Sequence, residues 1–287
     1  MARDDNRVPG FGRVPGYDPT RSGTAGQLFD LRGNRADKLP AAVRGLHTRQ
    51  FGALVGNIGH VLNSATDAEI EAGRQWYPQA QDHARRIGHI NAMRHGTRIS
   101  DDEAINMGAA MLAIHSPQNE WGRNLMAAHS VAARGDLLKE HGLQYTGSQA
   151  QLDKSLPVSR GEVDPSEGIV VPGRPRLKTY HFYENIRDPR GGNDFVTIDR
   201  HSHDAPTGMV ISGDNRGLSD ERRYNAMADV YRTAHGMLGQ QFDLNQGSDL
   251  QAAVWVPWKR LKGDRRPGAD FDQYLRDTGE YDRYYSL

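Results

Sequence analysis

Short helix-start signals recur along this chain, and apolar residues at helical spacing follow each of them. Thr66-Asp-Ala-Glu69, Ser100-Asp-Asp-Glu103 and Ser248-Asp-Leu-Gln251 each place a hydroxyl residue three positions before Glu or Gln. In this pattern, called a capping box, the two side chains satisfy each other's backbone N–H groups. The second signal precedes an apolar run, expected to form a central core helix, at Ile105, Met107, Met111, Leu112 and Ile114. Because no segment has a strong β-strand pattern, the chain is predicted to be all-α, with minor strands at most.

Composition excludes several classes of site. There are no cysteines, so disulfides, Cys-ligated zinc and iron–sulfur clusters are excluded, and we expect neither a cofactor nor a metal. No apolar run approaches the roughly 20 residues of a membrane span, and none follows the charged N-terminus as in a signal peptide. A cytoplasmic location is therefore expected. Lys and Arg balance Asp and Glu at 36 each, so any DNA contact must come from a local basic patch.

The distribution of Gly and Pro predicts three parts. Residues 1–38 are expected to form an irregular arm, in which Arg-Val-Pro-Gly occurs twice. This arm would either drape over the surface or dock on a partner. Residues 39–265 are expected to form a helical domain, with a loop over 161–175, and residues 266–287 a tail rich in Tyr and charge.

A polar stretch follows the central apolar helix. Ser116 and Asn119 are candidate helix caps, and Pro117 suits the start of a following helix. This stretch is either a well-capped helix junction or part of a pocket. In the second case Gln118, Asn119 and Trp121 would contact a nucleobase by hydrogen bonds and stacking.

A basic turn precedes the helix predicted over 178–186. Arg174, Arg176, Lys178 and Thr179 lie where backbone N–H groups at a helix start already attract anions. They would form a phosphate site, or else simply a solvated basic turn. Further along the predicted helix, Tyr183 is a candidate pocket residue.

An acidic residue closes the apolar run Val196-Thr-Ile198. Asp199 would lie at the edge of the core, where partial burial can make a carboxylate a usable base. Arg200 is a candidate phosphate contact and His201 a candidate pocket residue. Two alternatives remain: Asp199 is simply a helix N-cap, or it binds a metal together with His201, His203 and Asp204.

The order of these parts resembles the helix-hairpin-helix DNA glycosylase superfamily, which includes endonuclease III and the 8-oxoguanine glycosylases. A Ser-Pro-Gln stretch comes after an early helix, then Lys178-Thr at a helix start, then an apolar run ending in Ile-Asp-Arg-His. The chain is also similar to a family of actinobacterial phage proteins with the same elements. The hairpin departs from the superfamily, since it has Gly173-Arg-Pro-Arg-Leu before Lys178 where the superfamily has Gly-x-Gly.

The resemblance implies a two-lobed helical core that flips a base out of DNA into a pocket. It implies that Asp199 is the catalytic aspartate, that Lys178 is the nucleophilic lysine of bifunctional members, and that Gln118 lies near the base pocket. We therefore expect a DNA glycosylase, with or without lyase activity, acting on a damaged or modified base.

Two other functions stay open at this point. One is base hypermodification in phage DNA, in which an amine replaces a pyrophosphate held by Arg174 and Arg176, as proposed for glutamyl/putrescinyl thymine pyrophosphorylases. The other is a non-enzymatic nucleic-acid-binding or virion-associated protein, in which Lys178 and Asp199 are structural.

Overall fold

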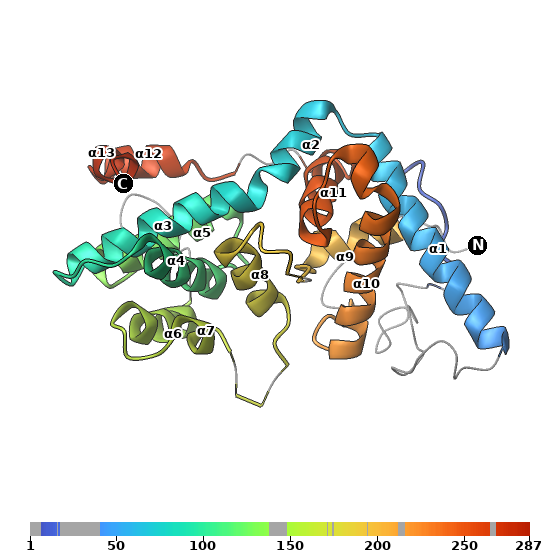
Figure 1. Ribbon diagram of the computed structural model, residues 1–287. Helices are drawn as coiled ribbons and strands as arrows, with labels where there is room; N and C mark the ends of the chain where they lie inside the picture. Colours follow the sequence, from blue (N-terminus) through green and yellow to red (C-terminus); the bar gives the residue numbers. More distant parts are fainter. Residues whose placement is uncertain are drawn as a thin grey trace. The chain divides into compact units, whose positions relative to one another are not determined.

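The computed structural model describes residues 7–15, 17, 41–137, 148–170, 172–173, 175–193, 195–211, 216–264 and 268–287. In these ranges the chain is mostly helical, and the β-type pairing consists of an isolated bridge between Arg7 and Met209 (Figure 1). The predicted all-α class is therefore confirmed. None of the helices described is both long and apolar enough to cross a membrane.

The helices follow one another along the chain without intervening strands. Their bounds are α1 Ala41–Asn63, α2 Asp67–Arg74, α3 Trp76–Arg94, α4 Asp101–His115, α5 Trp121–Arg134, α6 Gln149–Ser159, α7 Pro165–Gly168, α8 Lys178–Arg187, α9 Arg200–Thr207, α10 Glu221–Leu238, the 3-10 helix η3 Gly239–Phe242, α11 Gly247–Leu261, α12 Phe271–Asp277 and α13 Tyr281–Tyr285.

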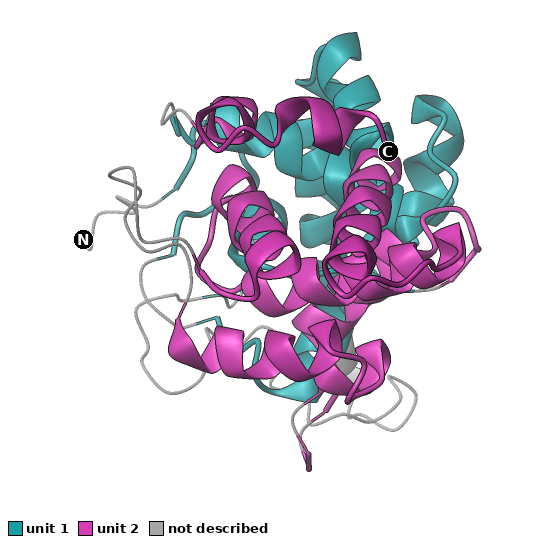
Figure 2. Ribbon diagram, turned by 90° about the vertical axis from the view of Figure 1, so that its left-hand side faces the viewer, with its two compact units in different colours: residues 1–76, 194–265 teal, residues 77–193, 266–287 magenta. Residues whose placement is uncertain are grey.

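The chain divides into two compact units, each made from two separate stretches of sequence (Figure 2). Unit 1 comprises Met1–Trp76 and Asp194–Arg265, and unit 2 comprises Tyr77–Asn193 and Arg266–Leu287. Most of unit 2 is thus an insertion, in sequence, between the two halves of unit 1. The C-terminal segment, expected as a tail, forms α12 and α13 of unit 2.

Unit 1 is built around α1 and α11. Helix α1 contacts α9, α10 and α11, and α2 lies along α11. A side chain at Gly73 would place its Cβ 2.3 Å from the Ala253 Cα, so α2 and α11 approach closely because this position carries no side chain. The unit's largest fully buried side chains include Trp258, Tyr224 and Tyr231.

The N-terminal segment 7–15 packs into unit 1. Phe11 is buried, with its ring 4.7 Å from that of His60 and 5.4 Å from that of Trp258. The Asn57 side chain accepts from the Gly12 N–H at 2.8 Å and donates to the carbonyls of Gly12 and Pro206 at 3.1 and 2.7 Å. This part of the predicted arm is therefore irregular but belongs to the core, where it contacts the end of α9.

Unit 2 is built around α4, which contacts α5, α6, α7 and α8. Its residues from Gly108 to His115 are all buried, as the apolar run predicts for a central helix. Helix α12 packs on α5 and supplies the buried Phe271, Tyr274 and Leu275.

The predicted helix starts are confirmed at two of the three capping boxes. Thr66 with Glu69 and Ser100 with Glu103 make both reciprocal hydrogen bonds. The prediction at Ser248 is wrong, because α11 already begins at Gly247 and its N-cap is Gln246. Ser248 therefore has helical backbone rather than the extended conformation of an N-cap. The N-cap Gln246 makes no side-chain capping hydrogen bond, and the Asp249 carboxylate, inside the first turn, accepts from the Asn245 N–H at 3.1 Å.

The loop predicted over 161–175 contains a short helix, α7. Asp164 caps it by accepting from the Ser166 N–H at 2.8 Å, and Pro165 occupies the first helical position. Both are ordinary helix-start signals. The sequence-based prediction of a loop followed the many Gly and Pro residues of this stretch and did not use the helix-start signals at Asp164 and Pro165.

Candidate functional site at the start of α9

Asp199 is the N-cap of α9, the first helix after the chain re-enters unit 1. Its Oδ1 accepts from the Ser202 N–H at 2.7 Å and from the Ser202 hydroxyl at 2.9 Å. The side chain is partly exposed, whereas His201 to Thr207 are all buried. The carboxylate is therefore fixed at the accessible end of a helix whose body is packed into the core.

The residues behind Asp199 come from neighbouring helices. The Gln251 side-chain amide of α11 donates to the Ser202 hydroxyl at 2.9 Å, and the Tyr231 hydroxyl of α10 donates to the Ser202 carbonyl at 2.8 Å. These contacts fix the first turn of α9 from two sides. Sequence reasoning missed Gln251, because nothing in its local sequence indicates a partner so far away along the chain.

An aromatic and basic cluster adjoins Asp199 in unit 1. Arg200 is exposed, and its Nε donates to Nε2 of His201 at 3.3 Å. The His201 ring lies 6.1 Å from that of Trp255, and the Lys259 ammonium lies 4.6 Å from the centre of the Trp255 ring. Burial lowers the pKa of His201 to about 4, against the opposing effect of Asp199. His201 is therefore neutral at physiological pH, and the positive charge here comes from Arg200 and Lys259.

The remaining polar residues of α9 have structural partners. Asp204 forms a buried ion pair with Arg216, with contacts of 2.7 Å at both carboxylate oxygens, and His203 Nδ1 lies 3.2 Å from its Oδ1. In the part of the chain that the structure describes, no group of three or more His, Asp or Glu residues is arranged to hold a metal. Asp204 and His203 therefore anchor α9, and Asp199 is the carboxylate at its accessible end.

The predicted phosphate residues at the start of α8 lie in unit 2. Lys178 is the first residue of α8, and both it and Thr179 are partly exposed. Arg176 is exposed but pairs with Glu167 at 2.9 Å, and its guanidinium lies 4.8 Å from the centre of the Tyr180 ring. Arg174 lies outside the described residues. The start of α8 is therefore basic, with Arg176 already paired to a carboxylate.

The junction between α4 and α5, also in unit 2, is capped from both sides. The Asn119 side chain donates to the His115 carbonyl at 2.8 Å, and Glu120, rather than Asn119, is the N-cap of α5. Gln118 is exposed and has a φ of 66°, a left-handed conformation that is uncommon for a residue other than glycine. Such conformations are held by their surroundings and cluster at functional sites.

Trp121 and Tyr183 pack inside unit 2. The Trp121 ring makes edge contacts with those of His83 and Phe182, at 6.1 and 6.4 Å between ring centres. Tyr183 is fully buried, and its hydroxyl donates to Asn106 Oδ1. Burial raises the pKa of Tyr183 far above its usual range. Tyr183 thus holds α8 against α4 and presents no group to a ligand.

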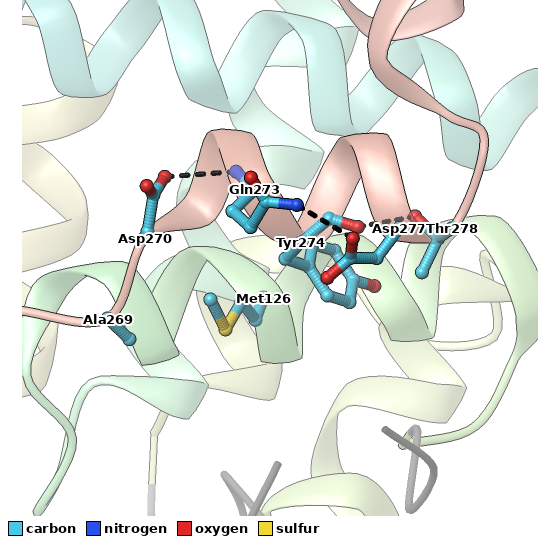
Figure 3. A pocket seen from close by; sticks show the side chains of 7 residues that line it. All are labelled: Met126, Ala269, Asp270, Gln273, Tyr274, Asp277 and Thr278. Carbon is cyan, nitrogen blue, oxygen red and sulfur yellow. Dashed lines mark hydrogen bonds between the residues drawn. The ribbon is translucent and has the colours of Figure 1, made fainter. Parts of the chain in front are cut away.

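A cavity of about 230 Å³ in unit 2 has none of the predicted site residues in its lining. It is lined by Met126, Ala269, Asp270, Gln273, Tyr274, Asp277 and Thr278 (Figure 3). Its polar groups bond to one another, since Gln273 Nε2 donates to Asp277 at 2.7 Å and the Thr278 hydroxyl donates to the Tyr274 carbonyl at 2.9 Å. Two carboxylates in its lining disfavour a phosphate.

The structure thus divides the predicted site residues between the units. Asp199, Arg200 and His201 are together in unit 1, whereas Gln118, Asn119, Trp121, Arg176, Lys178, Thr179 and Tyr183 belong to unit 2. Lys178 is the first residue of α8 and Asp199 is the N-cap of α9, and the chain passes from one unit to the other between them. Trp255 and Lys259 were missed, although their spacing of four on a helix places them on one face.

Searches among curated proteins and among solved structures gave no match. A family model, described as a family of unknown function (DUF7178), matches residues 41–262. The matched stretch contains α1 to α11, including Lys178, Asp199 and Gln251. Because this is well over half of the sequence, the chain belongs to the DUF7178 family, a family of unknown function.

Proposed function

We propose that this protein acts on bases in DNA, as a glycosylase that cleaves the N-glycosidic bond with Asp199 as its catalytic carboxylate. The observation that carries the proposal is the position of Asp199: it caps a helix whose body is buried, and two donors from Ser202 hold its Oδ1. The ordered Gln118, Lys178 and Asp199 motifs of the glycosylase resemblance support the same function.

The geometry suits a carboxylate that works as an anion. Charge-assisted hydrogen bonds and the positive end of the α9 dipole both stabilise the ionised form of Asp199. When the bond between the sugar C1′ and the base nitrogen breaks, the base leaves with the electron pair and C1′ becomes positive. A preorganised carboxylate stabilises this developing charge. In hydrolysis, water then bonds to C1′ and gives up its proton, for which Asp199 is the acceptor.

Lys178 would add a second reaction in a bifunctional enzyme. Its amine, once deprotonated, bonds to C1′ as the base departs, and opening of the sugar ring gives a Schiff base. Borohydride reduces that Schiff base to a stable covalent link. Lys178 is the first residue of α8 in unit 2, where its side chain is partly exposed.

DNA is the proposed partner, although the chain has no net charge. Arg200 is exposed beside Asp199, and Lys259 lies on the Trp255 ring in the same unit. Cations of this kind contact phosphates, and indole rings stack with unpaired bases. Together they provide the local basic patch that an overall neutral chain requires.

The test measures base release and covalent trapping on phage and actinobacterial genomic DNA. We expect Asp199→Asn to slow base release at least one-hundredfold, because the amide keeps its helix-capping oxygen but carries no charge. Asp220→Asn is the matched control, since Asp220 caps α10 in the same unit by accepting from the Arg223 N–H at 3.1 Å. Unchanged base release in Asp199→Asn would contradict the proposal.

Borohydride trapping separates the two chemistries. A protein–DNA adduct that disappears in Lys178→Gln indicates a bifunctional enzyme, whereas base release without an adduct indicates hydrolysis that depends on Asp199 alone. If DNA carrying pyrophosphorylated bases instead acquires an amine with no base release, the protein modifies bases and the glycosylase proposal is wrong.

A further inference from the structure

The Ser202 side chain lies between the proposed catalytic carboxylate and a glutamine of another helix. Its hydroxyl is 2.9 Å from Asp199 Oδ1 on one side and 2.9 Å from Gln251 Nε2 on the other. We propose that Gln251 is a positioning residue that orients the Asp199 carboxylate through Ser202. The effect of Gln251 on catalysis rests on the proposed function. The hydrogen bonds that connect Gln251, Ser202 and Asp199 do not depend on that function.

The direction of the hydrogen bonds makes this a relay. A hydroxyl has one hydrogen to donate, while the Gln251 Nε2 is a donor and has no acceptor capacity. Because Gln251 donates to the Ser202 oxygen, the hydrogen of Ser202 points to Asp199. Without Gln251 the hydroxyl would be free to rotate toward other acceptors, and Asp199 would retain the Ser202 backbone N–H at 2.7 Å.

Burial leaves these side chains few alternative arrangements. Ser202 is 1% exposed, Gln251 6% and Tyr231 0%. Tyr231 donates to the Ser202 carbonyl at 2.8 Å and so fixes the backbone of this turn independently of Gln251. Removing the Gln251 amide is therefore expected to free the Ser202 hydroxyl, while the helix that carries it stays in place.

Two substitutions separate orientation from simple burial. Gln251→Met keeps the length of the side chain but has no N–H donor, and Gln251→Glu keeps the shape but replaces the donor with an acceptor. Gln50→Met is the matched control, because Gln50 is a 2% exposed glutamine of unit 1 that donates to the Pro15 carbonyl at 2.7 Å. Both Met variants remove an N–H donor from a buried side chain.

The first readout needs no substrate. The side-chain carboxyl ¹³C resonance of Asp199, assigned by its absence in Asp199→Asn, is expected to shift in Gln251→Met and further in Gln251→Glu. It should stay unchanged in Gln50→Met. The second readout is single-turnover base release, expected to fall about tenfold in Gln251→Met with substrate affinity unchanged, the equivalent of one lost hydrogen bond.

The outcomes distinguish the relay from the proposed function. If Asp199→Asn leaves base release intact, the glycosylase proposal fails, and the carboxyl resonance still decides whether Gln251 orients Asp199. If Asp199→Asn abolishes base release while Gln251→Met changes neither the resonance nor the rate, the function stands and the relay is wrong. Equal shifts in Gln251→Met and Gln50→Met would also overturn the relay.

Discussion

Replacing Gly108 with alanine is expected to destabilise unit 2 by about 3 kcal/mol, the upper part of the range for overpacking a core. Helices α3 and α4 meet through small residues on both sides. A Cβ at Gly108 would lie 1.9 Å from the Ala84 carbonyl oxygen, and a Cβ at Gly88 would lie 2.0 Å from that of Ala104. Both obstacles are backbone atoms, so no side-chain rotation relieves the overlap, and the helices must separate.

Urea denaturation of the native protein and the variant measures this loss. Gly56→Ala is the control, because Gly56 is also helical but nothing lies within 4 Å of its missing Cβ. Alanine there should stabilise α1 by up to about 1 kcal/mol through its higher helix propensity. We therefore expect the free energy of unfolding to fall in Gly108→Ala and to rise in Gly56→Ala. Equal or greater stability in Gly108→Ala would show that α3 and α4 do not cross this closely.

Unit 2 is expected to lose stability steeply as the pH falls below 6.5. Burial lowers the pKa of His83 and of His115 to about 4, and that of His129 to about 3. Between pH 6.5 and 4 the unfolded chain therefore binds protons that the folded unit excludes. The free energy of unfolding therefore keeps its full value above pH 6.5 and falls as the pH decreases toward the pKa values of the folded histidines.

The expected size of this effect is large. Each histidine costs up to 1.36 kcal/mol per pH unit, and integration between pH 6.5 and 5 gives about 1.6 kcal/mol per group and about 5 kcal/mol for the three. This matches the whole stability of many domains. His201 and His203 act in the same direction in unit 1, since burial lowers the pKa of both.

Urea denaturation between pH 7.5 and 5, followed by tryptophan fluorescence, provides the measurement. His129→Phe should reduce by about one the number of protons that the chain binds on unfolding at pH 5. The variant keeps a ring beside Phe271 and Tyr274 but has no titrating group at this position. A free energy of unfolding that stays constant from pH 7 to pH 5 would contradict the prediction.

Several helix starts could be predicted because a cap depends on residues within one turn. The boxes at Thr66 and Ser100 and the N-cap at Asp199 all follow from local sequence. Ser248 shows the limit of this reasoning, since α11 begins one residue before it and the N-cap is Gln246. A helix boundary can shift by one or two residues at little local cost, so a capping pattern does not fix the first residue of the helix by itself.

The arrangement of the N-terminal segment could not be predicted in the same way. Its Gly and Pro residues correctly predicted irregular backbone, yet they gave no indication of the Asn57 side chain that holds Gly12. Irregular backbone must find its hydrogen-bond partners somewhere. Here the partner is 45 positions away along the chain, and only packing brings the two together.

The sequence by itself determined that the chain is helical, where several of its helices begin, and that an aspartate caps the helix after the apolar run at 196–198. Local hydrogen bonding and side-chain periodicity control these features, and both act within a few residues. The tertiary structure alone decided that α9 is buried along its body and that Ser202 connects Asp199 to Gln251. It also decided that Asp204 is an internal ion-pair partner. Contacts between residues as distant as Ser202 and Gln251 depend on how whole helices pack, which no short stretch of sequence specifies.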